Sequence, residues 1–320
     1  MVYESFLSSI TEHLQHKLGD DYQIFIRRIP KNNGVILDGL CIHSNKRSMA
    51  PAIYLNSYFE QYEEGMSLDE IIQDILNLYR SAVIPDAICG TELFHPDVLQ
   101  SKIMFKLIHA ESNRELLNDI PHIRYLDLAI VFYLYLDHSA SGQLTALIHK
   151  EHIQNWNLKV KDLWQSALVN TPLAFPAEIR SMAELMKEIA RDQLGDEFDE
   201  ALIDALLTNE DETSPLYVLS NINGLNGAAC ILYQNILKDF ADSVGSDLII
   251  LPSSIHEVLI TLNSPGASYE DLSNMVTAIN QHEVPPEDQL SNQVYLYTRD
   301  NDRICIVSHG TPAVGVSAVN

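Results

Sequence analysis

The stretch that decides the fold runs from Asp247 to Leu262 and reads Asp-Leu-Ile-Ile-Leu-Pro-Ser-Ser-Ile-His-Glu-Val-Leu-Ile-Thr-Leu. Two short apolar runs flank a Pro-Ser-Ser break, and a His-Glu pair opens the second run. Short apolar runs separated by a turn signal are typical of a β-hairpin. We therefore predict a strand, a tight turn and a second strand, with the polar residues of the hairpin gathered at its bend.

The order of a hairpin followed by a helix recurs along the chain, at about 22–80, 126–170 and 247–282. These three stretches share no residue-level identity, so they have a common pattern and are not a proven sequence repeat. The pattern predicts an α+β fold, in which repeated hairpin-helix units form mainly antiparallel sheets with helices packed on one face.

Hydrophobic periodicity places the individual elements. Apolar residues at helical spacing predict helices over 3–18, 68–79, 97–108, 158–169, 179–189 and 231–240. Short apolar or alternating runs predict strands over 22–29, 35–43, 52–55, 126–136, 143–152, 216–219, 293–297 and 303–307. Capping patterns at Ser67–Glu70 and Ser268–Asp271 predict where two of the helices begin.

A chain of 320 residues exceeds one typical domain. Pro85 and Gly90 fall in an irregular stretch over 82–95 that is a linker candidate. We therefore expect an N-terminal α+β module over 1–88 and a larger α+β region over 89–310. The larger region contains an acidic excursion at 192–213, and residues 311–320 are expected to form a flexible tail.

The charge balance excludes an ordinary nucleic-acid binder. The chain carries 44 acidic and 20 basic residues, a formal charge of −24, whereas phosphate recognition needs Lys and Arg. Anionic membrane surfaces are disfavoured for the same reason. Nine of the acids lie between Asp192 and Glu212, with no Lys or Arg among them. This segment is read as a solvated surface, as an acidic patch for a basic protein partner, or as a nucleic-acid mimic.

Cysteine usage and hydropathy indicate a soluble cytoplasmic protein. The four cysteines are far apart and form no C-x-x-C pair, at positions Cys41, Cys89, Cys230 and Cys305. Buried free thiols in a reducing compartment are the expected state. No signal-peptide pattern opens the chain, and the longest apolar run, Leu126–Leu136, is about half the roughly 20 residues that a membrane span needs.

Motifs for catalysis and cofactors are missing or incomplete. The sequence has no P-loop and no G-x-G-x-x-G, so we expect no nucleotide cofactor. His149 and His152 have H-x-x-H spacing, but on the strand predicted there their rings would face opposite sides, which disfavours a metal site. We therefore expect no metal and lean away from an enzyme.

His256-Glu257 begins like the zinc-protease motif H-E-x-x-H, but Ile260 stands where the second histidine is needed. A structural histidine is the favoured interpretation of His256. The alternative is a hydrolase or metal-assisted enzyme centred on His256 and Glu257, with distant partners such as Asp137, His138 or His152.

Two polar breaks in apolar context are the best candidate for a binding site. One is the Asn-rich loop that follows the predicted strand at 216–219, and the other is the bend of the 247–262 hairpin. The candidate binding residues are Asn221, Asn223, Asn226, Ser253, Ser254, His256 and Glu257. The leading hypothesis is a soluble, non-enzymatic binding protein with an acidic surface and a protein partner.

Several strings also carry a family resemblance. Leu251–Val258, Ser220–Gly224 with the following Gly-Ala, and Asp162–Thr171 with its Leu-Trp-x-x-Ala pattern resemble the bacterial family known as domain of unknown function 5688. This resemblance covers nearly the whole chain and implies a cytoplasmic protein of gut-type Gram-positive bacteria, with no catalytic residue to carry over. The order of Leu-Trp-x-x-Ala-x-x-Asn, an Ala-rich helix and a strand ending in Pro-Ser is more loosely similar to family 1444 of unknown function.

Overall fold

The computed structural model describes residues 2–44, 52–81, 96–139, 142–194, 215–307 and 313–314. The chain forms two compact units, one of Met1–Ile103 with Tyr133–Ile148 and one of Met104–Phe132 with His149–Asn320. The expected linker over 82–95, and with it the expected boundary after residue 88, lies outside the described residues. The first unit therefore takes in a segment from the middle of the chain that no shift in composition marks.

The first unit begins with helices packed against a three-stranded sheet in the order β1-β2-β3. Strands β1 and β2 pair antiparallel over their full length, from Tyr22 opposite Ser44 to Pro30 opposite Ile36. Asn33, with φ of 57°, makes the turn between these strands. The elements are α1 (Tyr3–Leu18), β1 (Tyr22–Pro30), η1 (Asn32–Gly34), β2 (Ile36–Ser44), β3 (Ile53–Tyr54), α2 (Leu55–Glu63) and α3 (Leu68–Ser81).

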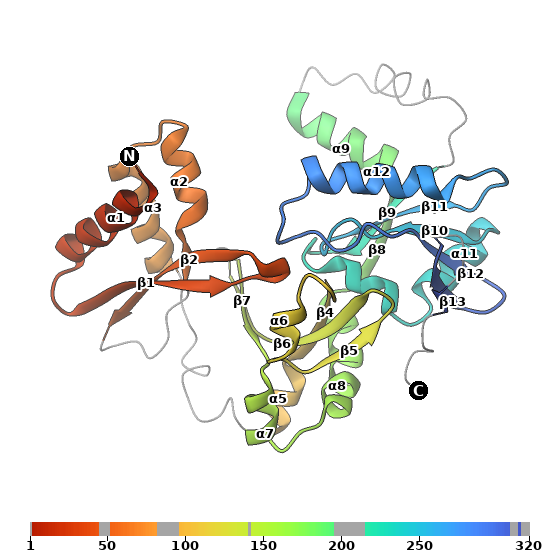
Figure 1. Cartoon of the computed structure of the whole chain (residues 1–320), viewed down its shortest axis with the longest axis horizontal. Helices are drawn as coiled ribbons and strands as arrows, with labels where there is room; N and C mark the ends of the chain where they lie inside the picture. The colour runs from red at the N-terminus through yellow and green to blue at the C-terminus, as the bar shows by residue number, and fades with distance from the viewer. Residues whose placement is uncertain are drawn as a thin grey trace. The chain divides into compact units, whose positions relative to one another are not determined.

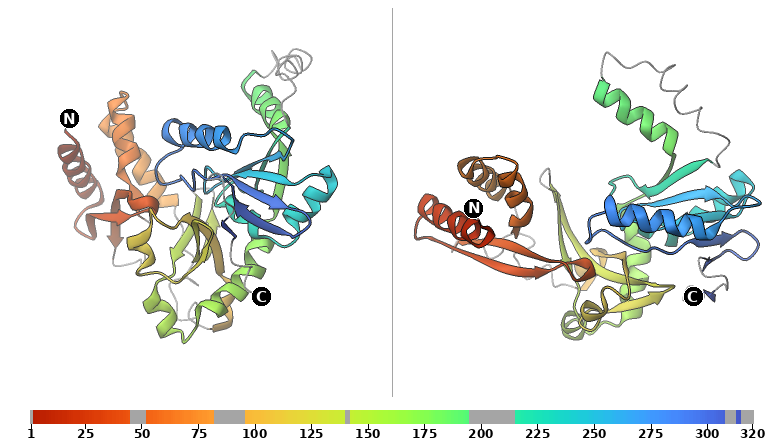
Figure 2. Two further views of the ribbon diagram at one scale, coloured as in Figure 1. Left: turned by 45° about the vertical axis from the view of Figure 1, so that its right-hand side comes forward. Right: turned by 45° about the horizontal axis from the view of Figure 1, so that its top comes forward.

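The core of this sheet lies on one face, as the predicted periodicities require. Phe6, Ile10 and Leu14 on one stripe of α1 pack with Leu40 and Ile42, which alternate along β2. Helices α1, α2 and α3 all lie on the same side of the hairpin (Figures 1 and 2). Here the predicted arrangement of helices on one face is confirmed.

The predicted start of α3 is confirmed in atomic detail. The Ser67 backbone N–H and hydroxyl both donate to the Glu70 carboxylate, at 2.9 and 2.7 Å, and the Glu70 N–H donates back to Ser67 Oγ at 3.3 Å. These bonds lower the pKa of Glu70. Helix α2 was not predicted, although Leu55, Tyr58, Phe59 and Tyr62 have helical spacing.

The middle of the chain forms a sheet in the order β4-β6-β5, with β7 also pairing with β6. The prediction of one helix over 97–108 is wrong. A short helix ends at Ser101, and the apolar run from Ile103 is a strand buried on both faces. For such a strand the short length of the apolar run, and not its periodicity, distinguishes it from a helix. The elements are α5 (Pro96–Ser101), β4 (Ile103–His109), α6 (Arg114–Leu117), β5 (His122–Tyr125), β6 (Leu128–Ser139), β7 (Gly142–Leu147), α7 (Lys150–Asn155) and α8 (Val160–Ala174).

The second unit contains a seven-stranded sheet in the order β14-β13-β12-β10-β11-β9-β8. The predicted hairpin is confirmed, because β10 and β11 pair antiparallel from Leu248 opposite Leu262 to Leu251 opposite Leu259. Strand β10 is the central strand. The elements are β8 (Ala177–Ser181), α9 (Met182–Leu194), β9 (Leu216–Asn221), η4 (Gly227–Leu232), α11 (Ile236–Val244), β10 (Leu248–Leu251), β11 (Val258–Leu262), α12 (Tyr269–His282), β12 (Tyr295–Thr298), β13 (Arg303–Ile306) and β14 (Ala313–Val314).

Both faces of this sheet are covered, which explains why all four residues of β10 are buried. Ile249 and Leu251 pack with Val276 of α12, and α12 lies along that face in each view (Figures 1 and 2). On the opposite face, Tyr217 of β9 makes an edge contact with Phe240 of α11 at 4.9 Å. The α+β class with antiparallel sheets is confirmed, but here the helices are not restricted to one face.

Three further predictions differ from the structure. The strand predicted over 143–152 ends at Leu147 and is followed by α7, because His149 caps a helix. The helical pattern at 179–189 begins with strand β8, which pairs with β9. Within the expected flexible tail, Ala313–Val314 pairs with β13. Most of the acidic excursion at 192–213 lies outside the described residues.

Candidate functional site

The two polar breaks predicted as a binding site lie in contact in the second unit. The loop after β9 meets the bend between β10 and β11 through three hydrogen bonds. Ser220 Oγ donates to the His256 carbonyl at 2.7 Å, the Ala228 N–H donates to the Ile255 carbonyl at 3.2 Å, and the Asn226 N–H donates to His256 Nδ1 at 3.3 Å. Segments about 30 residues apart in the sequence therefore form one local structure.

The asparagines of the loop shape its backbone. The Asn221 side chain, 5% exposed, donates to the Leu225 carbonyl at 2.8 Å and accepts from the Asn223 N–H at 3.0 Å. Asn226 adopts a left-handed conformation with φ of 55°, which Asn tolerates better than most residues. A loop is therefore present where the sequence predicted one. The amide of its Asn221 hydrogen-bonds within the loop.

The loop and the bend meet so closely that Gly227 has no room for a side chain. A Cβ at this position would overlap Ser220 Oγ and the His256 carbonyl, and would lie 2.8 Å from the Asn221 nitrogen. The glycine is thus required by the approach of two backbones.

The bend is also tied to a third segment, which follows α12. Ser254 Oγ accepts from the His256 N–H at 3.0 Å. The Ser253 carbonyl accepts from the Leu290 N–H at 2.9 Å, and the Ile255 N–H donates to the Asp288 carbonyl at 2.8 Å. These backbone bonds bring the Asp288 side chain to the bend.

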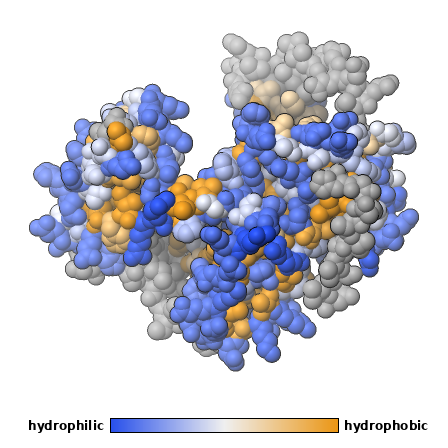
Figure 3. All heavy atoms as spheres, viewed as in Figure 1, coloured by the Kyte–Doolittle hydropathy of each residue, from blue (hydrophilic) through white to orange (hydrophobic). Residues whose placement is uncertain are grey.

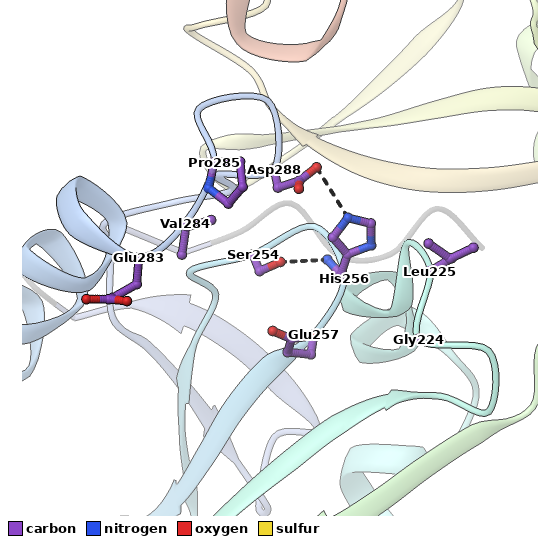
Figure 4. A pocket seen from close by; sticks show the side chains of 9 residues that line it. All are labelled: Gly224, Leu225, Ser254, His256, Glu257, Glu283, Val284, Pro285 and Asp288. Carbon is purple, nitrogen blue, oxygen red and sulfur yellow. Dashed lines mark hydrogen bonds and ion pairs between the residues drawn. The ribbon is translucent and has the colours of Figure 1, made fainter. Parts of the chain in front are cut away.

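His256 lies at the junction of the three segments, and both ring nitrogens have partners. Because Nδ1 accepts from the Asn226 N–H, the ring proton is on Nε2. Nε2 lies 3.2 Å from Asp288 Oδ1, and the two side chains point toward one another (Figure 4). His256 and Asp288 are 26% and 28% exposed. The ring is held in one tautomer between the loop and the Asp288 turn.

A pocket of about 350 Å³ opens beside this pair (Figure 4). Its lining combines acidic groups with apolar side chains, which come from the loop and from the segment after α12. The lining residues are Gly224, Leu225, Ser254, His256, Glu257, Glu283, Val284, Pro285 and Asp288. Among the residues that the structure describes, no lysine or arginine lines the pocket.

His256 and Glu257 both precede β11 (Val258–Leu262), and both line the pocket. Ser254 lines it as well, whereas Ser253 is buried and binds through its backbone. Two catalytic partners considered for His256, Asp137 and His138, lie in β6 at positions whose side chains are not described.

The third considered partner, His152, belongs to a separate cluster on α7. His152 Nδ1 accepts from the His149 N–H at 3.1 Å, and its ring stacks on Trp156. Burial and the nearby His149 lower the pKa of His152. His149 Nδ1 lies 2.5 Å from Asp119 Oδ2. Within the described ranges no group of three or more His, Cys, Asp or Glu side chains is placed to hold a metal ion.

The expectations about membrane spans, surface character and cysteines can be compared with the structure as well. Across the described ranges, no helix is both long and apolar enough to cross a membrane. The side of the molecule shown in Figure 3 is largely hydrophilic where it is described, with hydrophobic residues in smaller patches. Burial raises the pKa of Cys230 to about 12, so this thiol stays protonated at neutral pH. Cys89 lies outside the described residues.

Fold and site together define an α+β protein with antiparallel sheets and an acidic surface pocket at the end of a central hairpin. The chain belongs to the family of unknown function DUF5688, whose sequence profile matches residues 3–299. The predicted resemblance to this family is therefore confirmed. Neither the curated proteins nor the solved structures contain a match to the chain.

Sequence reasoning missed Asp288, the closest ionic partner of His256. Asp288 follows two prolines and an acid after α12, a composition typical of an ordinary surface turn. One local signal was available. The turn that contains Asp288 joins a capped helix to the strand predicted at 293–297, and a turn at the end of a strand is a place where a side chain can reach a neighbouring loop. Only the three-dimensional pairing of the bend with residues 288–291 shows that its carboxylate reaches His256.

Proposed function

We propose that the pocket beside His256 is a binding site without catalytic activity of its own, and that it takes a basic side chain presented by a partner protein. The observation that carries the proposal is the pocket lining, in which Glu257, Glu283 and Asp288 supply carboxylates and no basic residue offsets them among the described residues. A lysine or arginine has a charged head for these carboxylates and a methylene stem for apolar walls.

The pocket's apolar lining supports the same ligand class. Leu225, Val284 and Pro285 line the pocket beside the carboxylates, and Leu225 is 40% exposed. A metal ion would gain nothing from these side chains, whereas the stem of an arginine would contact them. The formal charge of −24 would also speed the approach of a basic partner.

The state of His256 supports binding over catalysis at this pocket. A general base must lie within hydrogen-bond reach of the proton that it removes. Among the described residues, the partner of His256 Nδ1 is the Asn226 backbone N–H and not a hydroxyl or thiol, and the Nε2 proton faces Asp288. The histidine is therefore suited to holding the loop, the bend and the Asp288 turn in place around the pocket. In the proposed role the protein acts in the cytoplasm.

An NMR titration of the ¹⁵N-labelled chain with N-acetyl-arginine amide tests the ligand class. Binding in the pocket should shift the amide signals of Leu225, His256 and Val284. The neutral isostere N-acetyl-citrulline amide should bind several-fold more weakly, because it lacks the charge that the carboxylates attract. Added salt should weaken arginine binding, since the pocket is open to solvent.

Matched variants localise the effect. Glu257→Gln should weaken arginine binding, while Glu63→Gln, which removes an exposed acid of α2, should leave it unchanged. Equal binding of the arginine and citrulline compounds, or equal binding by both variants, would count against the proposal.

Photo-crosslinking in cells tests the partner. A photoreactive amino acid at Leu225 should capture one protein, and adding Glu257→Gln should abolish the capture. The same amino acid at Val169 of α8, which is 59% exposed, is the control and should not capture that protein. Capture from both positions would show non-specific contact and refute the assigned surface.

A further inference from the structure

The second unit holds another histidine–aspartate pair, outside the pocket, and this pair has a serine hydroxyl beside it. His109 ends β4, Ser112 lies in the turn that follows, and Asp127 lies in the turn between β5 and β6. The side chains of His109 and Asp127 are 26% and 20% exposed, and Ser112 is exposed. We propose that these three residues form a nucleophilic relay that takes an acyl group from a carboxylic ester.

The position of the proton on His109 is fixed by a backbone donor. The Ser112 N–H donates to His109 Nδ1 at 3.3 Å, so Nδ1 carries a lone pair and the ring proton is on Nε2. Ser112 Oγ lies 2.8 Å from the same nitrogen. Because Nδ1 is an acceptor, the hydroxyl must donate. The base and the hydroxyl proton that it removes therefore already face each other.

Asp127 lies on the other side of the imidazole. Its Oδ2 is 3.9 Å from His109 Nε2, about 1 Å longer than a hydrogen bond, and such distances commonly shorten when a substrate binds. Ser291 Oγ donates to Oδ2 at 2.6 Å, and Tyr295 Oη donates to Oδ1 at 2.5 Å. Both donors hold the Asp127 carboxylate in place, with Oδ2 directed toward the ring.

The turn that delivers Asp127 is strained. Leu126 has a φ of 54°, and in the described part of the chain every other residue with positive φ is Asn, Asp or Gly. A leucine in this conformation costs about 1 kcal/mol or more. The Ala110 N–H donates to the Asp127 carbonyl at 3.0 Å, which ties the turn to the end of β4. Strain of this kind is concentrated at functional sites.

The proposed reaction is acyl transfer to Ser112 followed by hydrolysis. Ser112 Oγ forms a bond to the ester carbonyl carbon while its proton passes to His109 Nδ1. The bond from that carbon to the leaving oxygen breaks, and the leaving oxygen takes the proton from His109 to depart as an alcohol. Water then attacks the acyl-serine with His109 as base, which releases the acid and restores the hydroxyl. No cofactor is needed.

A fluorophosphonate probe tests the relay in the full-length chain. Ser112 Oγ should form a bond to phosphorus with loss of fluoride, giving one adduct that peptide mass spectrometry locates at Ser112. Ser112→Ala should give no adduct, and His109→Gln should slow labelling roughly a hundredfold. Ser8→Ala, which alters an exposed serine of α1 whose hydroxyl donates to the Glu4 carbonyl, is the control and should label like the wild type.

Asp127 is a positioning residue in this relay, since it acts through His109. Asp127→Asn should lower the maximal labelling rate without changing the probe concentration that gives half of that rate, with folding checked by circular dichroism. Absence of an adduct at Ser112 after exhaustive incubation would refute the proposal. So would a labelling rate in His109→Gln equal to that of the wild type, since Ser112 would then react without its base.

Discussion

Two histidine–aspartate pairs of the second unit, His256–Asp288 and His109–Asp127, are built alike around the ring and differ in what surrounds it. In each pair a backbone N–H donates to Nδ1 at 3.3 Å, and the protonated Nε2 faces a carboxylate. At His256 the backbone donor is 30 residues away in sequence, so the ring joins separate segments. At His109 the donor is three residues away, and a serine hydroxyl shares Nδ1.

The same imidazole tautomer thus serves two purposes. His256 closes a tertiary junction, and its ring contacts a backbone N–H and a carboxylate but no hydroxyl or thiol in the described part of the chain, which fits a role in shaping a pocket. His109 belongs to a local turn and is not needed to join segments, which leaves it available for proton transfer. The feature that distinguishes a reactive pair from a structural pair is therefore a neighbouring hydroxyl, since both pairs contain the histidine and the aspartate.

The largest loss of unfolding free energy is expected at Gly227, where the loop and the bend that His256 joins approach each other most closely. Gly227→Ala would place a Cβ against Ser220 Oγ and the His256 carbonyl, and should lower the free energy of unfolding by about 3 kcal/mol. It should also remove the arginine-induced shift of His256. Trp156 and Trp164 both lie in the second unit, so tryptophan fluorescence in a urea titration follows that unit.

The control for this variant is Gly245→Ala. Gly245 has a φ of 72° and no atom within 4 Å of an added Cβ, so only backbone strain of about 1 kcal/mol is expected. Labelling of Ser112 should persist in the folded Gly227→Ala protein, because the His109 turn is local. A loss in Gly227→Ala no greater than in the control would show that the loop and the bend move apart at little cost.

A smaller difference is expected between the two carboxylates. Asp127→Asn should cost about 2 kcal/mol, because Tyr295 is fully buried and its hydroxyl and that of Ser291 donate to a charged group. Asp288→Asn should cost less than about 1 kcal/mol, since its partner His256 is partly exposed and an amide oxygen can still accept from Nε2. Both losses can be measured from the urea concentration at the midpoint of unfolding, provided that the dependence of the free energy of unfolding on urea is the same in the variants and the wild type.

Equal losses of unfolding free energy in Asp127→Asn and Asp288→Asn would contradict the distinction between Asp127, which accepts bonds from Tyr295 and Ser291, and the partly exposed Asp288. Tyr295→Phe is the companion variant for the first pair. It keeps the ring in the core and removes one donor to Asp127, so its loss should be a part of that seen in Asp127→Asn.

The sequence predicted the local elements and the place of the pocket, but not the ionic partners. The Asp247–Leu262 hairpin, the Ser67 capping box and the two polar breaks all follow from neighbouring residues, which hydrophobic period and turn chemistry describe well. Asp288 and Asp127 reach their histidines through backbone pairing between distant segments, such as Ile255 with Asp288 and Ala110 with Asp127. No local pattern encodes such a meeting. Strand β4 was mistaken for part of a helix for a different reason, because periodicity does not separate a strand buried on both faces from a segment of a buried helix.

The smallest effect concerns a third ring, His152, which lies beside another histidine. His152 Nδ1 accepts the His149 N–H as the other two rings accept theirs, and burial, with His149, lowers its pKa from the ordinary 6.5. The unfolded chain therefore takes up this proton first, so acid favours unfolding. The free energy of unfolding should therefore fall slightly as the pH drops below about 6.5. Replacing the ring by His152→Gln should reduce the slope of unfolding free energy against pH between 7.5 and 5.5. An unchanged slope would mean that His152 takes up its proton equally well in the folded and unfolded states, which would contradict the effect of burial and of His149 on this ring.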